Sequence, residues 1–268
     1  MSLTPTPPPA ARDPWPEIDR IAGDIRVDVA LCPTWYNAGK VVFDYAVALA
    51  ALLPALLLIG LAAAAVKVTS PGPVFYSQTR LGLGGRRYKI VKLRTMHHNA
   101  ELKSGIVWAK SDDDRVFRVG KWLRRTHIDE LPQLFNVLLG QMSLVGPRPE
   151  RPEVIAAKGL DRLVPGYGSR LLVKPGVTGF AQVQLPADAD VTSVRHKVVY
   201  DLYYVRKQSL WFDLRLVLAT ALKAMGVKPR VIRTAFLLPG RDKVAAEFTR
   251  TLSPADAAAV AARQFQQA

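Results

Sequence analysis

Residues Arg124–Glu150 read RRTHIDELPQLFNVLLGQMSLVGPRPE, and this stretch decides how the rest of the chain is interpreted. Apolar residues recur at helical spacing after the adjacent carboxylates Asp129 and Glu130, and Gly140 follows as a stop signal. Because a proline is tolerated in the first helical turn, Pro132 predicts that the helix begins at or just before Asp129. The positive end of the helix dipole would then hold the Asp129 carboxylate ionised, as a nucleophile or a cation ligand requires.

Acidic residues in a first helical turn are also common caps, so Asp129 and Glu130 alone leave a purely structural role open. The run G-P-R-P near the end of the stretch favours chemistry instead. Pro147 and Pro149 hold Arg148 in an extended backbone, which suits a guanidinium that binds phosphate. An arginine held beside paired carboxylates indicates phosphate chemistry.

The charge of the chain indicates anionic partners. Its 268 residues include 37 Lys and Arg against 22 Asp and Glu, which gives a formal net charge of +15. Nucleic acid, acidic lipid headgroups and phosphorylated small molecules all fit this charge, and composition alone slightly favours nucleic acid. The single cysteine, Cys32, excludes an intramolecular disulfide, and no Cys/His cluster offers a zinc site.

A long apolar run predicts a membrane segment. The run from Tyr45 to Val66 holds no charged residue, and as a helix it would be about 33 Å long. The residues that follow, up to Glu101, carry only basic charges, so the positive-inside rule makes that flank cytoplasmic. Pro54 lies near the middle and can break the helix, so a single span and a hairpin that returns to the same face both stay open.

Residues 69–228 hold further local patterns. Two extended runs around the glycine-rich turn at residues 82–85 predict a β-hairpin, with Lys92 and Arg94 on one face of its second strand. Residues 111–115, S-D-D-D-R, are either a metal loop or a cap for a basic helix over residues 119–125. A helix is expected from Glu150 to about Leu163. Residues 198–225 fit either an interfacial membrane helix or ordinary packing.

These blocks together resemble the bacterial sugar transferases, the monotopic phosphoglycosyl transferases that start polyprenol-linked glycan assembly. The resemblance covers about Tyr36 to Gly226. Besides the opening stretch and the membrane segment, it includes PGPVFYSQTRLG, YKIVKLRTM, VKPGVTGFAQV and DLYYVRKQSLWFDL.

The resemblance implies transfer of a hexose 1-phosphate from a UDP-sugar donor to undecaprenyl phosphate, with release of UMP, through a covalent aspartyl-phosphosugar intermediate. This is the first membrane step of exopolysaccharide or other surface-glycan assembly, on the cytoplasmic face of the bacterial inner membrane. Anionic membrane lipid is an implied partner, nucleic acid is not, and a homodimer is left open. The identity of the sugar is not readable from the sequence.

The resemblance also implies roles for individual residues. Asp129 would be the nucleophile and Glu130 its partner, with Arg124 and Lys92 holding this pair. Mg²⁺ would bind Asp129 together with substrate phosphates, a ligand set that needs no dedicated metal motif. Residues expected to bind the substrate or its phosphates are Arg148, Pro147, Pro149, Arg94 and Asp201.

The implied fold is α+β and predominantly helical: a monotopic membrane protein with one re-entrant helix, a small β-hairpin and interfacial amphipathic helices. The family bends its membrane helix at a Ser-Pro pair, whereas this chain has Leu53-Pro54, so the proline kink is expected without the serine's contribution. The expected organisation is a disordered or loosely held lead without a signal peptide (1–35), the re-entrant membrane helix (36–68), a cytoplasmic transferase domain (69–228) and a C-terminal extension of unknown role (229–268).

Two rival interpretations remain. A non-catalytic scaffold anchored in the membrane would explain the basic surface and the apolar run, but not the paired carboxylates. A nucleic-acid-binding protein would explain the charge, but no reading motif accompanies it.

Overall fold

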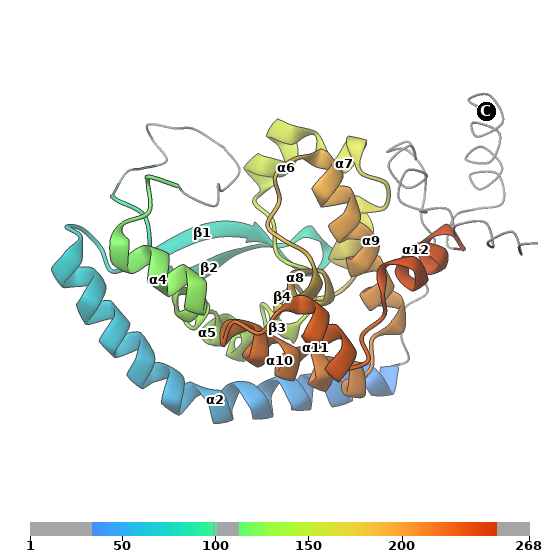
Figure 1. The fold of residues 1–268 in the computed structure, drawn as a ribbon, viewed down its shortest axis with the longest axis horizontal. Helices are drawn as coiled ribbons and strands as arrows, with labels where there is room; N and C mark the ends of the chain where they lie inside the picture. Colours follow the sequence, from blue (N-terminus) through green and yellow to red (C-terminus); the bar gives the residue numbers. More distant parts are fainter. Residues whose placement is uncertain (1–33, 99, 101–112, 251–268) are drawn as a thin grey trace, which may run out of the picture.

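Helices dominate the chain and two small sheets lie among them, which confirms the predicted mostly helical α+β class (Figure 1). The computed structural model describes residues 34–98, 100 and 113–250, so the lead predicted over residues 1–35 falls almost entirely outside them. The elements are α2 (Thr34–Thr69), β1 (Phe75–Leu81), η1 (Leu83–Gly85), β2 (Arg87–Leu93), α4 (Arg118–Thr126), η2 (Ile128–Glu130), α5 (Gln133–Leu138), β3 (Ser143–Val145), α6 (Pro152–Lys158), α7 (Leu160–Leu163), η3 (Tyr167–Leu172), β4 (Gly176–Thr178), α8 (Phe180–Gln184), α9 (Val191–Lys207), α10 (Leu210–Ala224), α11 (Pro229–Ala235) and α12 (Arg241–Thr249).

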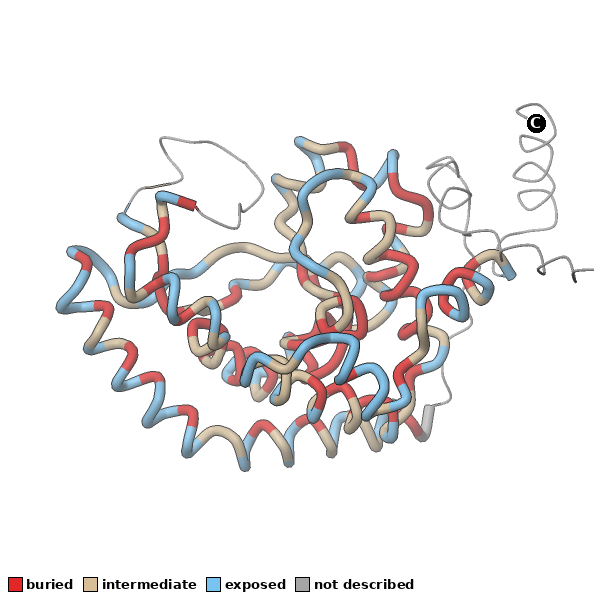
Figure 2. Tube along the Cα trace, viewed as in Figure 1, coloured by how far each residue is buried: buried red, intermediate tan, exposed pale blue. Residues whose placement is uncertain are grey.

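The predicted membrane segment is the 36-residue helix α2, which runs along one side of the molecule (Figure 1). The chain does not leave the helix at Pro54, because α2 continues through this residue as one helix, and this helix is bowed along its length (Figure 1). A proline removes one helical hydrogen bond, and the buried residues Ala48 and Ala55 pack on either side of Pro54. Buried and exposed positions alternate along α2 (Figure 2). The buried stripe is Ala48, Ala55, Ile59, Ala62 and Val66, and the exposed leucines are Leu49, Leu53, Leu56, Leu57, Leu58 and Leu61.

Both ends of α2 are bound to the rest of the protein. Near its start, the Lys40 Nζ lies 2.8 Å from the Asp213 carboxylate of α10. Just past its end, the Arg94 guanidinium donates hydrogen bonds to the carbonyl oxygens of Ser70 (2.6 Å) and Pro71. The helix therefore lies against the same folded unit over its whole length.

The predicted β-hairpin is confirmed. β1 and β2 pair antiparallel from Phe75 opposite Leu93 to Leu81 opposite Arg87. Gly84 has φ 62° in the turn between the strands, a left-handed conformation that glycine adopts without strain. The hairpin places Lys92 on β2, opposite Tyr76 of β1.

A second sheet, which the sequence did not predict, joins β3 and β4 in parallel. Glycine permits this contact: a side chain on Gly146 would lie 2.4 Å from the carbonyl oxygen of Lys174. The G-P-R-P run follows β3 directly, so this close backbone contact sets the position of Arg148.

Two stretches expected as single units are divided. The helix expected from Glu150 to about Leu163 is split into α6 and α7 by Gly159, whose φ is 59°. The 198–225 stretch belongs to two helices, α9 and α10, because the chain turns at Gln208 and Ser209. The Ser209 hydroxyl then caps α10 by accepting a hydrogen bond from the Phe212 backbone N–H.

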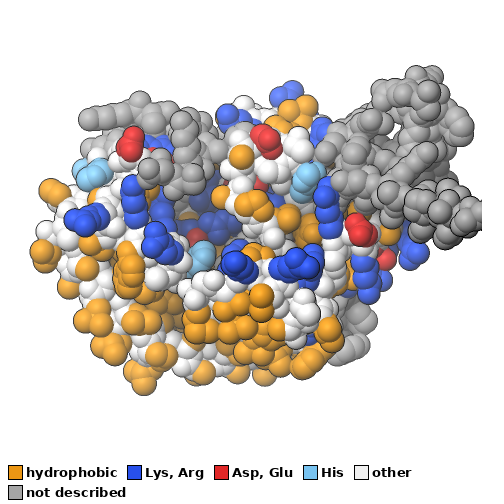
Figure 3. Space-filling model, in the orientation of Figure 1, with side chains coloured by type: hydrophobic (Ala, Val, Ile, Leu, Met, Phe, Trp, Pro, Cys, Tyr) orange, Lys and Arg blue, Asp and Glu red, His pale blue; other side chains and the backbone are white. Residues whose placement is uncertain are grey.

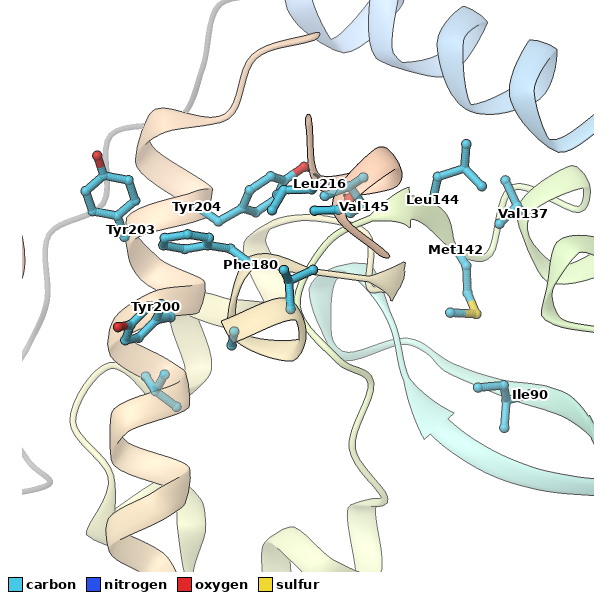
Figure 4. Packing of buried hydrophobic residues seen from close by; sticks show 14 of the residues in the cluster. Ile90, Val137, Met142, Leu144, Val145, Phe180, Tyr200, Tyr203, Tyr204 and Leu216 are labelled. Atoms are coloured by element: carbon cyan, nitrogen blue, oxygen red, sulfur yellow. Dashed lines mark hydrogen bonds between the residues drawn. The ribbon is translucent and has the colours of Figure 1, made fainter. Parts of the chain in front are cut away.

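The core lies between α8, α9 and α10, around Phe180. Its ring lies 5.0 Å from that of Tyr200 and 5.2 Å from that of Phe212, centroid to centroid. Figure 4 shows Phe180 among Tyr203, Tyr204 and other buried side chains. The C-terminal extension adds to this core as far as the structure describes it, through Ile232 of α11 and Val244, Ala245 and Phe248 of α12.

Helix α10 has two different apolar faces. Leu216 and Ala219 are fully buried, whereas Trp211 and Met225 are 67% and 70% exposed. One side of α10 therefore packs against the domain, as one of the two alternatives for this stretch expected, and its other side is apolar and exposed, which leaves the interfacial membrane helix as a prediction.

Candidate active site

A cavity of about 590 Å³ opens between the β1–β2 hairpin, the segment after β2 and the turn η2. Figure 3 shows basic side chains gathered around a hollow beside the hydrophobic part of the surface. Its cationic lining residues are Arg80, Lys92, Arg94, Arg115, Arg124, Arg148 and Arg151, and its acidic ones are Asp129 and Glu130. Such a lining attracts anionic ligands.

The paired carboxylates lie in a tight turn rather than at the start of an α-helix. His127 ends α4 with φ 58° and ψ 16°, and Ile128–Glu130 form the 3₁₀ turn η2. The expectation that the helix begins at Asp129 is therefore wrong, since α5 starts after Pro132. Proline has no N–H to donate to the Ile128 carbonyl, which disfavours a regular α-helix across this point. A non-glycine residue at positive φ costs about 1–2 kcal/mol, and such strain is concentrated at functional sites.

Two cationic side chains, Lys92 and Arg148, donate hydrogen bonds to Glu130. Its Oε1 accepts hydrogen bonds from Lys92 Nζ at 2.6 Å and from Arg148 at 3.0 Å. Burial alone would raise the pKa of Glu130, but Arg148 and Lys92 outweigh it and hold this pKa well below its usual range. Glu130 is therefore ionised, and it binds together a lysine of β2 and the arginine that follows β3.

Asp129 is buried but differently placed. Burial, and then the charge of Glu130, raise the pKa of Asp129 to about 6, against the opposing effects of Lys92, Arg124 and Arg148. We expected the helix dipole to lower the pKa of Asp129, and this expectation is wrong because burial and Glu130 raise it. The carboxylate is still mostly ionised at neutral pH. Its Oδ1 has no hydrogen-bond partner within residues 34–98, 100 and 113–250, and the Asp129 side chain lines the cavity.

Arg124 and Arg94 both line the cavity, in different ways. The Arg124 Nε donates a hydrogen bond to the Thr95 hydroxyl at 2.8 Å, and its charge acts on Asp129 without a direct bond between them. Arg94, expected to bind phosphate, donates hydrogen bonds from both terminal nitrogens to the carbonyls of Ser70 and Pro71, just past the end of α2. Arg94 therefore fastens the membrane-segment helix next to the cavity.

Asp201 does not line the cavity. Its carboxylate lies 2.8 Å from the Arg170 Nε, and the same guanidinium donates a hydrogen bond to the Arg148 carbonyl at 3.0 Å. The two flanking prolines are also held through their carbonyls, which accept from Gly176 N–H (3.0 Å) and Arg80 (3.2 Å). Arg170 was missed in the sequence because no local pattern marks it.

The cavity fits a magnesium ion bound by one carboxylate. Among the described residues there is no group of three His, Cys, Asp or Glu side chains that could hold a metal without help. Asp113, from the predicted acidic loop, is paired with Arg115 at 2.6 Å, and residues 111–112 lie outside the described residues. Mg²⁺ in proteins usually binds one or two carboxylates and completes its coordination shell with phosphates and water. The Asp129 Oδ1, which has no partner among the described residues, suits such a site.

Comparison with known proteins places this chain in a family. Residues 35–226 match the family described as bacterial sugar transferase. The chain is 42% identical over 184 residues to a UDP-glucose:undecaprenyl-phosphate glucose-1-phosphate transferase of Xanthomonas campestris pv. campestris, an alignment that covers 68% of this chain and 37% of that protein. It is 46% identical over 178 residues to a protein of the same name from Caulobacter vibrioides, covering 64% of each.

A third relative, the exopolysaccharide production protein PSS of Rhizobium leguminosarum bv. phaseoli, is 39% identical over 188 residues, or 69% of this chain and 92% of that protein. The chain thus spans between a third and two thirds of the first two relatives and nearly all of the third. On the match over residues 35–226, the chain belongs to the bacterial sugar transferase family.

Proposed function

We propose that this chain transfers a hexose 1-phosphate from a UDP-sugar to undecaprenyl phosphate and releases UMP. The observation that carries the proposal is the unpartnered, buried Oδ1 of Asp129 beside a cationic cavity of about 590 Å³. The names of the relatives, which include glucose-1-phosphate transferases that act on undecaprenyl phosphate, support this donor and acceptor class.

In the first half-reaction, an Asp129 oxygen attacks the phosphorus bonded to the sugar. The bond between that phosphorus and the oxygen that bridges the two phosphates breaks, and UMP leaves with the bonding electrons. Arg148 and Lys92, held together on Glu130, stabilise the charge that develops on the phosphate oxygens. Bound Mg²⁺ would supply further neutralisation of the donor's phosphates.

In the second half-reaction, a phosphate oxygen of undecaprenyl phosphate attacks the same phosphorus and displaces Asp129. The product is the sugar linked to the lipid through a diphosphate, and the carboxylate is regenerated. Because attack and release happen at one carboxylate, the same cationic side chains serve both steps.

We further propose a monotopic placement at the cytoplasmic face of the bacterial inner membrane. Lys40 near the start of α2 and Ser70 just past its end both bind the transferase domain, so a helix in this arrangement returns to the side it enters from. Lipid would contact the exposed leucines of α2 and the exposed apolar side chains of the helices beside it. These are Trp122 of α4, Phe135 of α5, Leu139, Trp211 and Leu218 of α10, and Met225.

The test is release of UMP by the detergent-solubilised protein with Mg²⁺, undecaprenyl phosphate and a panel of UDP-sugars. Wild type is expected to release UMP with at least one sugar. Asp129→Asn is expected to release none, whereas Asp161→Asn, on an exposed carboxylate of α7, is expected to keep full activity. Folded wild-type protein that is silent with every UDP-sugar would favour the non-catalytic scaffold.

The covalent intermediate has its own test. With a UDP-sugar labelled with ³²P at the sugar-bound phosphate and no lipid acceptor, the label should remain on the wild-type protein. Adding undecaprenyl phosphate should then remove the label from the protein and transfer it to lipid. Label that never attaches to protein, in a preparation that still forms lipid product, would point to direct transfer between the two substrates.

A further inference from the structure

The turn after α11 is built around a leucine in a conformation that glycine normally adopts. Leu237 has φ 49°, and the one other non-glycine residue with positive φ in the described chain is His127 of the active-site turn. The Leu238 N–H donates to the Arg233 carbonyl at 2.9 Å, a helix-ending pattern in which glycine usually occupies the left-handed position. A leucine there is strained.

The strained leucine makes little contribution to the core. Its side chain is 82% exposed, while its neighbour Leu238 is buried. The turn is held from α10 by Arg215, whose Nε donates to the Phe236 carbonyl at 2.6 Å and whose terminal nitrogen donates to the Leu237 carbonyl. Two hydrogen bonds from the Arg215 guanidinium therefore hold the backbone of a turn whose leucine side chain is exposed.

The surroundings of this turn are apolar and continue the exposed face of α10. On that helix Trp211 and Leu218 lie one turn to either side of Arg215, and both are exposed. Asp213 faces the opposite side of α10, where it binds α2. Helix α10 thus lies between α2 and the Leu237 turn, and Figure 3 shows hydrophobic side chains gathered over this part of the surface.

The charge around the turn matches an anionic lipid surface. Residues 214–241 contain six basic residues and no Asp or Glu. Lys228, Arg230 and Arg233 are all exposed and flank the apolar positions Val231 and Leu237. Basic residues beside exposed apolar ones are typical of segments that lie in a bilayer interface.

We infer that the Leu237 turn is a second membrane anchor, outside the region that matches the family, which inserts Leu237 among lipid acyl chains while the basic residues around it contact anionic headgroups. The partner is therefore the bilayer, and the anchor gives the C-terminal extension a role. The inference rests on the proposed membrane placement of α2, so its test must separate the two.

The test measures the depth of single fluorescent labels. In the full-length chain with Cys32, its sole cysteine, changed to serine, a cysteine is placed at Leu237, at Leu57 on the exposed face of α2, or at Leu163 of α7, on the side of the molecule away from α2. Each variant is labelled with an environment-sensitive fluorophore and reconstituted in nanodiscs of phosphatidylglycerol and phosphatidylethanolamine that contain doxyl-labelled acyl chains.

The labels at positions 237 and 57 are expected to be quenched at least threefold more strongly than the label at position 163. Quenching at 57 without quenching at 237 would overturn the second anchor and leave the placement of α2 intact. Absence of quenching at both positions would overturn the membrane placement itself.

A second pair of variants separates anchoring from folding. Leu237→Gly relieves the backbone strain, so the thermal unfolding midpoint in detergent should equal or exceed that of wild type. In nanodiscs the same substitution should halve the quenching of a label at Val231→Cys, whereas Leu237→Met should preserve it. Unchanged quenching at position 231 in Leu237→Gly would show that the leucine does not anchor the turn.

Discussion

Asp213 and Asp129 are both buried carboxylates, but their surroundings differ. Asp213 has no exposed surface, and its oxygens accept hydrogen bonds from Tyr36 (2.9 Å), Lys40 (2.8 Å) and Tyr204 (2.6 Å). Asp129 keeps one buried oxygen without a hydrogen-bond partner in the described part of the chain. A buried polar atom without a partner costs stability, and beside a cationic cavity it marks a candidate for binding or catalysis. This difference supports a structural role for Asp213 and the proposed chemical role for Asp129.

The largest effect is expected from a substitution that tests the proposed catalytic role of Asp129. Asp129→Asn removes the proposed nucleophile and should lower the rate of UMP release at least about a thousandfold. The same substitution removes a carboxylate whose pKa is raised from 3.8 to about 6, so the free energy of unfolding at pH 7 should rise, by about 1–3 kcal/mol. Enzyme assays and denaturant unfolding in detergent measure the two effects.

Loss of both activity and stability in Asp129→Asn would contradict the comparison, because it would make Asp129 a structural residue like Asp213. Asp129→Glu is a useful companion, since it keeps the charge and displaces the carboxylate oxygens by about one bond length. It should remain folded and be far less active than wild type.

The next largest effect is expected from a substitution that tests the structural role of Asp213. Asp213→Ala leaves the partly buried Lys40 ammonium with Asp44, at 3.7 Å, as its remaining carboxylate partner, and removing one partner of a buried ion pair typically costs up to about 3–5 kcal/mol of unfolding free energy. Because Asp213 joins α2 to α10, this loss should also loosen the start of α2. Denaturant unfolding in detergent measures the change.

A double variant gives the control. Lys40→Met together with Asp213→Ala removes both charges of this pair, and Asp44 keeps its hydrogen bond from the Leu144 N–H at 3.2 Å, so the double variant should be more stable than Asp213→Ala alone. If Asp213→Ala cost less than about 1 kcal/mol, or if the double variant were the least stable of the set, the network would not stabilise α2 as proposed.

A smaller effect is expected in the pH dependence. Activity should rise as the pH increases through about 6, where Asp129 loses its proton, and then reach a plateau. Between pH 3.8 and about 6 the folded protein retains a proton that the unfolded chain has released, so the Asp129 contribution to stability falls as pH rises through this window.

Changing Lys92 sharpens the pH prediction. The charge of Lys92 lowers the pKa of Asp129, so Lys92→Met should move the midpoint of the kcat/KM profile to higher pH. Lys89→Met, at an exposed position of the same strand, is the matched control and should leave the midpoint unchanged. An identical midpoint in wild type and Lys92→Met would mean that the rate does not report the ionisation of Asp129.

The parts of the site that the sequence predicted are those with a local signal. Asp129, Glu130 and Arg148 lie within one short stretch, and their local signals, adjacent carboxylates and a proline-clamped arginine, are visible without a fold. Lys92 is 38 residues from Glu130, and its role came from the family resemblance rather than from spacing. The pairing of Lys40 with Asp213, separated by 173 residues, has no local signal at all.

The fold was predicted where periodicity is strong and missed where tertiary contacts decide. The hairpin and the long apolar helix follow from turn residues and from an uncharged run. The continuous helix at Pro54 opposes the local preference of proline, and the left-handed turn at His127 is a conformation that few non-glycine residues adopt. The parallel contact of β3 with β4 needs close approach of Gly146 to a distant segment, which periodicity cannot reveal.

The smallest effect is expected at Asp201. Like Asp213, this carboxylate is buried in an ion pair, but its partner Arg170 also contacts Arg148 of the candidate site. Asp201 holds the Arg170 guanidinium at 2.8 Å, and Arg170 holds the Arg148 carbonyl. Asp201→Asn keeps the shape but weakens this support, so the KM for the UDP-sugar should rise about tenfold while kcat changes little. Steady-state kinetics on folded protein measure the split. Equal falls in kcat and in the folded fraction would make Asp201 a purely structural residue, because a positioning role through Arg148 predicts weaker donor binding in an enzyme that still folds.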